Sequence, residues 1–242
     1  MQIEIASCTY QGGRDYNEDC VQYLEKDGTC AIVVADGLGG HGGGQIASSV
    51  AAEFITGAFM YNPELRADHI KTIFEQANDA VLKSQTNEKK MKSTAVALFI
   101  ADGSAIWGHV GDSRLYHFKD GTLVGQTLDH SVSQMAVFTG EIEQGQIRHH
   151  ADRNRVLRAI GLDEGFKPEI APMYEPEPGF HAFLLCTDGF WEYVLELEME
   201  IELAKAETPH DWINGMVYRL ARLVPEDSDN FSAAAVFLKA GV

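Results

Sequence analysis

Short runs of apolar and β-branched residues recur along the chain, and several of them meet at an Asp-Gly dipeptide. Asp-Gly between two such runs is a strong signal for a β-hairpin. Three pairs of runs have this arrangement: residues 20–24 with 31–35, residues 93–100 with 105–110, and residues 115–118 with 122–124. The pattern therefore predicts three antiparallel hairpins.

Four further segments have the composition of strands. Ile3 and Ile5 alternate with polar residues, which predicts a first strand with one buried face. Residues 182–186 and 231–238 are apolar runs typical of buried strands. Residues 169–174 contain a proline, which confines a strand to the edge of a sheet.

Other segments repeat apolar residues at the spacing of a helix with one buried face. They are residues 45–60, 67–84, 198–206 and 210–223. In the first helix we expect the buried face to carry Ile46, Val50 and Phe54. In the second we expect it to carry Ile70, Ile73, Phe74, Ala77 and Val81. A further helix is expected from Phe190, and residues 154–161 are expected to form either a short helix or a turn.

The order of these elements indicates the fold class. Hairpin-linked strands with helices gathered in pairs favour an α+β sandwich over alternating βαβ units. The chain has 242 residues, of which 45% are hydrophobic, so we expect one domain over residues 1–242 with a sizeable core. The periodic pattern weakens over residues 131–151, and a polar segment held between strands in this way is a candidate mobile flap.

The formal net charge of −17 excludes some classes of function. A nucleic-acid-binding surface needs a positive field, whereas an acidic chain attracts cations or basic peptides, or simply gains solubility. No apolar run approaches the roughly 18 residues of a membrane span, and the first residues lack the pattern of a secretory signal. We therefore expect a cytoplasmic protein that binds neither nucleic acid nor membrane.

The cysteines do not point to zinc. Cys8, Cys20, Cys30 and Cys186 include no C-x-x-C pair and have no companion histidine spacing. We expect them to be small, mostly buried apolar side chains.

The first candidate for chemistry is Asp36. It follows the apolar run 31–35 directly, and glycine stands at positions 37, 39, 40, 42, 43 and 44 after it. Glycine lets the backbone turn tightly and approach a ligand closely. This pattern therefore predicts that the Asp36 carboxylate is held rigidly at the end of a buried strand. The alternative is a solvated aspartate in an ordinary turn between a strand and a helix.

The same stretch also contains a G-x-G-x-x-G motif, formed by Gly37, Gly39 and Gly42. This motif is the fingerprint of dinucleotide-binding folds. Two features argue against that alternative. Asp36 would face the pyrophosphate, and the acid expected about 20 residues further on would fall in or just after the predicted helix.

Several other acids stand at the ends of predicted strands. The first hairpin returns the end of its second strand to the level of Glu18 and Asp19, so these two residues are expected close to Asp36. Three more acids occur where an apolar run begins or ends: Asp112, Asp188 and Asp229. If the strand ends meet, the clustered carboxylates must either take up protons or bind a cation.

The available ligands indicate which cation. Oxygen ligands without a nearby cysteine or histidine pair favour Mg²⁺ or Mn²⁺ over zinc. Two such ions about 3.5–4 Å apart generate a hydroxide nucleophile and hold a phosphoryl group. The residues by themselves therefore favour metal-dependent phosphoester hydrolysis.

Seven separated motifs span nearly the whole chain. They are Arg14-x-x-Asn17-Glu18-Asp19, Asp36-Gly-Leu-Gly-Gly-His41, Ser93-Thr94-Ala95, His109-Val-Gly-Asp112-Ser-Arg114, Asp129-His130-Ser131, Thr187-Asp188-Gly189 and Asp229-Asn230. In this order they resemble one family, the metal-dependent serine/threonine protein phosphatases of type 2C (PPM), and in particular its single-domain bacterial members.

The resemblance implies a fold and a set of metal ligands. The fold is a β-sandwich of two mainly antiparallel sheets with helices on both sides. Asp36 would bridge two Mn²⁺ or Mg²⁺ ions, with the Gly37 carbonyl on one ion and with Asp188 and Asp229 on the other. Glu18 would act mainly through metal-bound water. Asp112 and Asp188 resemble the pair that holds a third, weaker metal.

The resemblance also implies a reaction and roles for two other residues. A metal-bridging hydroxide would attack phosphoserine or phosphothreonine without a phosphoenzyme. Arg14 would anchor the phosphate, or else form a salt bridge with Asp15 or Asp19. His41 would protonate the leaving alkoxide as general acid, or else stabilise its loop.

The partners implied are phosphorylated proteins and a cognate serine/threonine kinase, and the default oligomeric state is a monomer. An alternative hypothesis to the enzyme is a catalytically weak regulatory module that binds phosphoproteins on the same fold. Retention of Asp36, Asp188 and Asp229 favours the enzyme.

Overall fold

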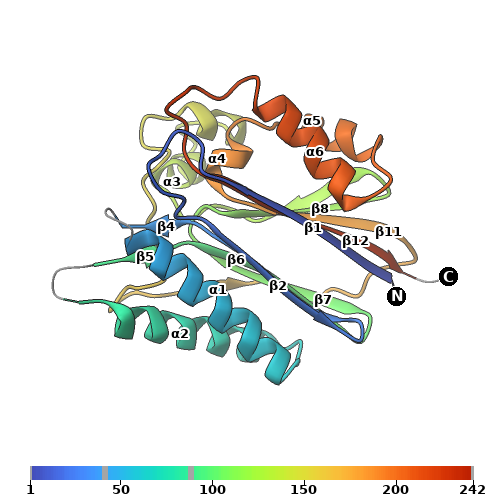
Figure 1. Cartoon of the computed structure of the whole chain (residues 1–242), viewed down its shortest axis with the longest axis horizontal. Coiled ribbons are helices and arrows are strands. Elements are labelled where there is room, and N and C mark those ends of the chain that lie inside the picture. Colours follow the sequence, from blue (N-terminus) through green and yellow to red (C-terminus); the bar gives the residue numbers. More distant parts are fainter. Residues whose placement is uncertain (1, 40–42, 87–89, 241–242) are drawn as a thin grey trace.

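The computed structural model describes the whole chain except residues 1, 40–42, 87–89 and 241–242. Two five-stranded antiparallel sheets lie face to face, and helices cover the outer face of each sheet (Figure 1). The predicted α+β sandwich is therefore confirmed. No helix among the described residues combines the length and apolar character needed to cross a membrane.

The first sheet joins the two ends of the chain. Its strands, in spatial order, are β1 (Gln2–Tyr10), β12 (Phe231–Ala240), β11 (Gly179–Cys186), β8 (Arg114–Lys119) and β9 (Thr122–Gln126). All neighbouring strands are antiparallel. This sheet is covered by α4 (Asp188–Trp191), α5 (Glu196–Leu203) and α6 (Pro209–Leu220).

The second sheet is built from the two earlier hairpins. Its order is β10 (Glu169–Ile170), β7 (Ser104–Val110), β6 (Ala95–Ala101), β3 (Thr29–Ala35) and β2 (Cys20–Lys26). Two long helices, α1 (Gly43–Tyr61) and α2 (Ala67–Ser84), cover its outer face. The short strands β4 (Gly37–Leu38) and β5 (Lys92–Ser93) pair beside it. Between β9 and β10 lie α3 (Val132–Phe138) and a 3₁₀ helix, η1 (Gln144–His149).

Strand β3 shows why the central strands read as continuous apolar runs. Ala31 and Val33 face the helices α1 and α2, whereas Ile32 and Val34 face the other sheet, and all four are fully buried. A strand covered on both faces has no solvent side, so it loses the alternation of apolar and polar residues.

The predicted buried face of the first helix is partly wrong. Ile46 is 42% exposed, and Val50 and Phe54 are only partly buried, whereas Ala47 and Ala51 are fully enclosed. The helix packs against the sheet through these small side chains near its start and through Ile55 and Phe59 further along, and both of these larger residues are fully buried. For the second helix, all five predicted residues are buried.

Two predicted boundaries also differ from the structure. The run 93–100 is divided at Thr94, because β5 pairs with β4 and only β6 continues into the sheet. Of the two alternatives for residues 154–161, the structure has no helix but turn positions and isolated bridges. The edge strand β10 is only two residues long, although Tyr174 still bridges to Ala105.

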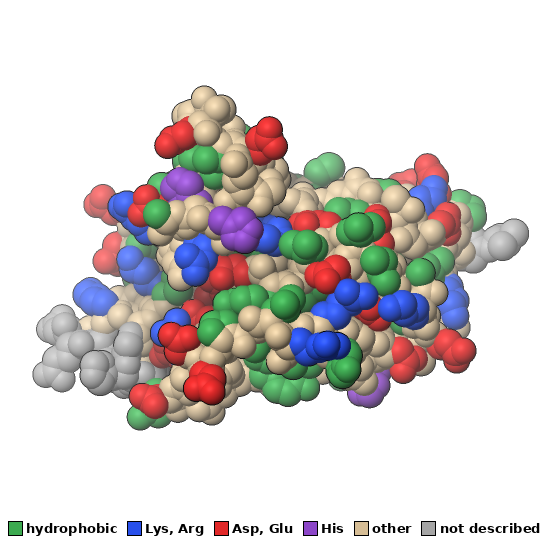
Figure 2. Space-filling model, turned by 90° about the horizontal axis from the view of Figure 1, so that it is seen from above, with side chains coloured by type: hydrophobic (Ala, Val, Ile, Leu, Met, Phe, Trp, Pro, Cys, Tyr) green, Lys and Arg blue, Asp and Glu red, His purple; other side chains and the backbone are tan. Residues whose placement is uncertain are grey.

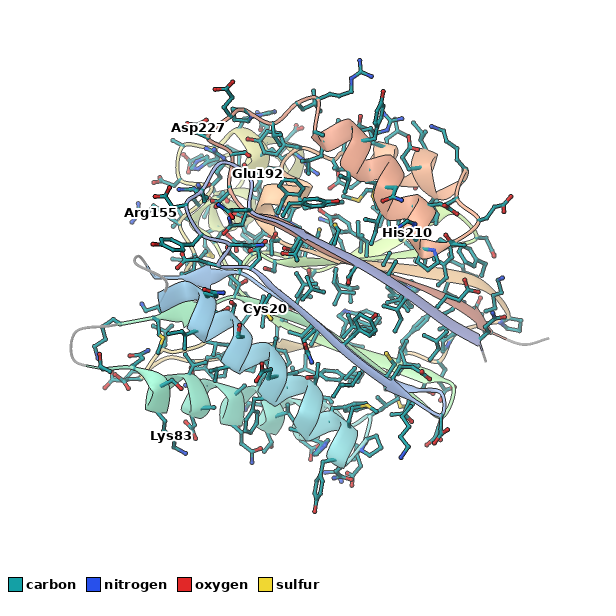
Figure 3. The ribbon with its side chains drawn as sticks, in the orientation of Figure 1. Cys20, Lys83, Arg155, Glu192, His210 and Asp227 are labelled. Carbon is teal, nitrogen blue, oxygen red and sulfur yellow. The ribbon has the colours of Figure 1, made fainter. Side chains whose placement is uncertain are left out.

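The surface carries both signs of charge. Figure 2 shows acidic and basic side chains interspersed over the face seen from above. In Figure 3, His210 and Lys83 lie on the outer helices, whereas Glu192, Arg155 and Asp227 lie at the loop end of the sandwich, away from the chain termini. The predicted acids converge at this loop end.

Candidate active site

The registers of the strands bring the acidic positions to one end of the sandwich. In the second sheet, Cys20 pairs with Ala35 and Ala95 pairs with Val110. In the first sheet, Cys186 pairs with both Arg114 and Ala233. Six acids lie within four residues of one of these paired positions: Glu18, Asp19, Asp36, Asp112, Asp188 and Asp229.

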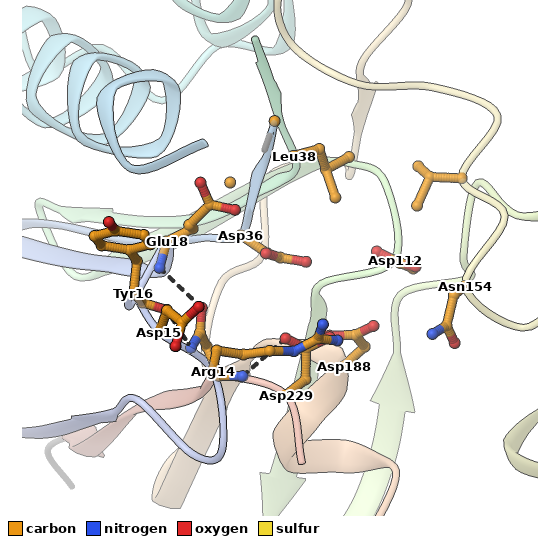
Figure 4. Close-up of a pocket in the computed structure, with 14 residues that line it drawn as sticks. Arg14, Asp15, Tyr16, Glu18, Asp36, Leu38, Asp112, Asn154, Asp188 and Asp229 are labelled. Atoms are coloured by element: carbon orange, nitrogen blue, oxygen red, sulfur yellow. Dashed lines mark hydrogen bonds and ion pairs between the residues drawn. The ribbon is translucent and has the colours of Figure 1, made fainter. Parts of the chain in front are cut away.

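These ends enclose a cavity of about 460 Å³. Its lining includes Arg14 and Gly37 together with five of the six acids: Glu18, Asp36, Asp112, Asp188 and Asp229. Figure 4 shows the carboxylates of Asp36, Asp112, Asp188 and Asp229 around one common space. The structure thus brings together every predicted site residue except His41, which lies outside the described residues.

The backbone of Asp36 is held on both sides by the neighbouring strand. The Asp36 N–H donates to Oγ1 of Thr94 at 3.0 Å, and the Thr94 N–H donates to the Asp36 carbonyl at 2.8 Å. One residue later, the Gly37 N–H donates to the Glu18 carbonyl at 3.1 Å. Glu18 and Asp36 are therefore fixed relative to each other, as the hairpin predicted.

Glycine is required where the first helix begins. A Cβ atom on Gly44 would lie 2.5 Å from the Gly37 carbonyl oxygen and 2.8 Å from Cδ of Glu18. The Gly44 N–H also donates to Oε1 of Glu18 at 3.1 Å. The glycine-rich stretch thus serves close backbone packing around Glu18.

Burial and repulsion between carboxylates both raise the pKa values of acids in this cavity. Burial, and then repulsion from neighbouring carboxylates, raises the pKa of Asp36 and of Asp188 well above the ordinary value. Burial, followed by the charge of Asp129, raises the pKa of Asp112 to about 7. Such a cluster of carboxylates favours a bound cation.

Asp19 belongs to the same cluster, although the sequence analysis assigned it no role as a ligand. Burial raises its pKa to about 7, and its side chain is only 9% exposed. One carboxylate oxygen accepts a hydrogen bond from Thr187 at 3.0 Å, and the other is buried with no partner in the part of the chain that the structure describes. Its position next to Glu18 in the sequence was the available signal.

Arg14 contacts a different acid from the two that the sequence suggested. Its Nη2 atom donates to Oδ2 of Asp229 at 2.8 Å, and not to Asp15 or Asp19. The side chain is 54% exposed at the rim of the cavity. One nitrogen of the guanidinium therefore binds Asp229, while the side chain stays partly exposed at the cavity rim (Figure 4).

Asn230 is a further residue for which the sequence suggested no function. Its Oδ1 atom accepts from the Glu18 N–H at 2.8 Å. Its Nδ2 atom donates to the carbonyls of Gln11 and Tyr16 at 2.6 and 2.9 Å. Asn230 thus fastens the loop that carries Arg14 and Glu18 to the start of β12.

The buried guanidinium of Arg114 supports the Asp112 loop through Trp191. Arg114 forms two hydrogen bonds of 2.7 Å with Asp129 and lies 3.5 Å from the centre of the Trp191 ring. The Trp191 indole N–H donates to the Asp112 carbonyl at 2.9 Å. The motif residues Arg114 and Asp129 therefore position the Asp112 loop and do not line the cavity.

The segment predicted as a mobile flap, residues 131–151, contains α3 and η1, and its mobility stays a prediction. Among the described residues, none from 131–151 lines the acidic cavity, whereas Asn154 and Val156 do. Arg153, beside them, donates to Glu192 at 2.9 Å. This wall of the cavity thus belongs to a segment with three arginines, Arg153, Arg155 and Arg158.

A second group of metal-binding residue types has a structural explanation. His109, His130 and Glu169 lie within 4.8 Å of one another. Nε2 of His109 donates to the Leu128 carbonyl, and Nδ1 of His130 accepts from the Gly111 N–H. These bonds leave a proton on Nε2 of His130, directed at Glu169, so hydrogen bonds hold this group together.

The residues of the acidic cavity fit hard divalent cations. Several carboxylates converge, one buried carboxylate oxygen lacks a partner, and no histidine or cysteine is among the described lining residues. Oxygen donors of this kind suit Mg²⁺ or Mn²⁺. A dinucleotide phosphate would instead meet a concentration of negative charge.

Comparison with known proteins gives consistent matches. A family model described as protein phosphatase 2C matches residues 12–221. The serine/threonine phosphatase stp of Listeria monocytogenes serovar 1/2a is 36% identical over 203 residues, which cover 80% of this chain and 79% of that protein.

Solved structures share the fold. The PPM Ser-Thr phosphatase MsPP from Mycobacterium smegmatis, in complex with cacodylate, is 26% identical with a TM-score of 0.82, covering 96% of this chain and 97% of that one. The catalytic domain of PstP, in complex with two manganese ions, is 23% identical with a TM-score of 0.80 and covers 97% of both chains.

Proposed function

This chain belongs to the protein phosphatase 2C family and is a serine/threonine protein phosphatase, and from that premise we propose how its acidic cavity performs the hydrolysis. Two divalent cations, Mn²⁺ or Mg²⁺, are held there. The convergence of Asp36, Asp188 and Asp229 from three distant segments carries this proposal.

The proposed ligands are the residues around the common space. Asp36 would be shared by both cations, Gly37 would hold one through its carbonyl, and Asp188 and Asp229 would hold the other. Glu18 would act through bound water, and Asp112 with Asp188 would hold a third cation more weakly. When bound, the two cations lower the pKa of a water molecule and polarise the phosphoryl group.

Arg14 binds the phosphate of the substrate. A guanidinium has five N–H donors in a fork that matches phosphate oxygens. Among the described residues, only Asp229 accepts a hydrogen bond from the guanidinium of Arg14, through Nη2. Its exposure at the rim supports a role in orienting the phosphoryl group.

His41 protonates the leaving oxygen of serine or threonine. His41→Asn is expected to slow hydrolysis of a phosphothreonine peptide much more than hydrolysis of p-nitrophenyl phosphate, because nitrophenolate leaves without a proton. A histidine that only stabilises its loop would slow both substrates alike.

The proposed partners are phosphorylated proteins and the serine/threonine kinase that the enzyme opposes. The proposed state is a cytoplasmic monomer with one catalytic domain. A module that only binds phosphoproteins has no need of these clustered carboxylates, so the intact cluster favours turnover.

The test measures phosphate release from a phosphothreonine peptide with and without Mn²⁺. Asp36→Asn is expected to lower the metal-stimulated rate by two orders of magnitude or more, equivalent to about 2.7 kcal/mol. The matched control is Asp102→Asn, because Asp102 lies in a remote turn at φ 49°, where asparagine is well tolerated. Absence of metal-stimulated release from the wild type would contradict the proposal.

A further inference from the structure

A second cavity, of about 370 Å³, runs along β8, where Leu115, His117 and Lys119 line it. It opens between the two sheets, with Trp107 on β7 and with His117 on β8 and Gly125 on β9. Tyr174 and Glu177, from the segment before β11, complete one side. We call it the aromatic cavity; none of its lining residues lines the acidic cavity.

Aromatic rings form a compact group at this cavity. The ring of Trp107 lies 6.1–6.2 Å from the rings of His117 and Tyr174, and the Tyr174 ring meets His117 edge-on at 4.9 Å. Two backbone hydrogen bonds with Ala105, of 2.7 and 2.8 Å, fix the position of Tyr174. The aromatic wall is therefore preformed.

The hydrogen bonds around His117 fix its tautomer. Nε2 of His181 lies 2.8 Å from the Glu177 carbonyl, so it must donate. Nδ1 of His181 then accepts, and Nε2 of His117, 3.1 Å away, donates to it. Burial lowers the pKa of His117 to about 4, so near neutral pH its Nδ1 atom carries a free lone pair.

This lone pair has no partner among the described residues. Nδ1 of His117 makes no hydrogen bond there, although the residue is only 5% exposed. Two polar side-chain atoms of the described residues are fully enclosed without a partner, Oδ1 of Asp19 and Nε of Arg148. Nδ1 of His117 is not one of them, so it is not fully enclosed. Because His117 lines the cavity, this acceptor is open to the cavity.

The two charged side chains that line the aromatic cavity neutralise each other. Lys119 and Glu177 form an ion pair there. A ligand therefore meets aromatic walls and the acceptor of His117, and Gln126 adds a second polar residue to the lining. An apolar cavity of this size with few well-placed polar groups has the character of a small-molecule site.

The strand pairing also favours a built site. His117 lies opposite Gly125 in the β8–β9 pair, and the register shifts at a bulge immediately after His117. Paired residues share one face of a sheet, so the missing side chain of Gly125 leaves room beside the His117 ring. A Cβ atom added to Gly125 would meet nothing within 4 Å. Bulges often re-aim side chains next to functional sites.

We propose that the aromatic cavity binds a flat, uncharged aromatic molecule that donates an N–H or hydroxyl hydrogen to Nδ1 of His117. Indole is the simplest representative. The ring stacks among Trp107 and Tyr174, and the single donor fixes its orientation. This site is independent of the phosphatase reaction.

The experiment titrates the full chain with indole and follows the Trp107 indole N–H and the His117 ring by nuclear magnetic resonance. Both signals are expected to shift together. N-methylindole, which lacks the donor, is expected to bind about tenfold more weakly, because the acceptor on His117 is then left without a partner. This comparison uses the wild-type protein and does not depend on the folding of a variant.

A pair of variants tests the location. Gly125→Leu fills the space beside His117 and is expected to abolish the shifts. The matched control is Gly57→Leu, since a Cβ atom on Gly57 also meets nothing within 4 Å, and it is expected to bind indole as the wild type does. Phosphatase activity on p-nitrophenyl phosphate checks that both variants are folded.

Three results would overturn the proposal. The first is indole that shifts neither signal up to its solubility limit. The second is equal affinity for indole and N-methylindole. The third is a folded Gly125→Leu variant that binds indole as tightly as the wild type.

Discussion

Burial raises the pKa values of four acids in the active site, and this has a consequence for stability; the four are Asp19, Asp36, Asp112 and Asp188. In the unfolded chain an aspartate titrates near pH 3.9, whereas the pKa values of Asp19 and Asp112 are raised to about 7. Between these values the folded state binds more protons than the unfolded state. The free energy of unfolding of the metal-free protein therefore falls as the pH rises through this range.

We expect the metal-free protein to melt at a lower temperature at about pH 8 than at pH 6.5, and Mn²⁺ to remove most of the difference. The comparison begins at pH 6.5 because burial lowers the pKa values of His117 and His130. Below pH 6.5 these two histidines make the free energy of unfolding rise with pH, which opposes the effect of the acids. Calorimetry in a chelator and in Mn²⁺ measures both curves. A higher melting temperature at about pH 8 without metal would contradict the expectation.

Trp191 illustrates a residue that acts through its neighbour. Its indole N–H holds the Asp112 carbonyl, so Trp191→Phe is expected to cost about 1–3 kcal/mol of stability. It is also expected to raise the Mn²⁺ concentration needed for half-maximal activity, because the Asp112 loop loses its support.

Trp212→Phe is the matched control for Trp191. Its indole N–H is equally buried and donates to the Met199 carbonyl at 2.9 Å, under α6 and away from the cavity. It should lower stability to a similar degree and leave the Mn²⁺ requirement unchanged. If the two variants had the same Mn²⁺ requirement, Trp191 would have no positioning role.

At the scale of elements, the site depends on how closely α1 begins beside β4. Gly44→Ala would force a methyl group against the Gly37 carbonyl and Glu18. We expect a loss of about 1–3 kcal/mol or more, together with lower metal-stimulated activity, measured by urea unfolding and phosphate release.

Gly57→Ala, in the same helix, provides the contrast. A Cβ atom there meets no neighbour within 4 Å, so the better helix former is expected to add about 0.5–1 kcal/mol of stability. Activity should not change. A Gly44→Ala variant as stable and active as Gly57→Ala would show that the helix start is not tightly packed.

Element pairing was largely predictable, because it follows local signals. Asp27, Asp102 and Asp120 each adopt positive φ before a glycine, as the hairpin prediction required. The face of α1 was not predictable in the same way. Small residues such as Ala47 and Ala51 lie against the sheet, and periodicity ranks residues by hydrophobicity and not by how closely two backbones approach.

At the scale of the molecule, the two sheets hold the active site at one end of the sandwich. Phe183, Leu185 and Val236 of the first sheet pack against Ile32, Val34 and Leu98 of the second. This shared core keeps Asp36 from one sheet in register with Asp188 and Asp229 beside the other.

Leu185→Ala, inside this shared core, is expected to cost about 2–5 kcal/mol. Leu197→Ala, on a side chain that is 66% exposed, should change stability by less than about 0.5 kcal/mol. Chemical denaturation measures both. Equal effects would mean that the interface between the sheets contributes little to holding the molecule together.

Turn chemistry and side-chain periodicity are local properties, so the residues predicted the strand ends, the hairpins and the acids beside them, and the motifs indicated the family. Three features follow instead from long-range packing. Arg14 contacts Asp229, Asp19 is buried with an oxygen that has no partner among the described residues, and His117 directs a lone pair into the aromatic cavity. Those features depend on which surfaces of the two sheets meet, and contacts across such distances leave no regular spacing along the chain.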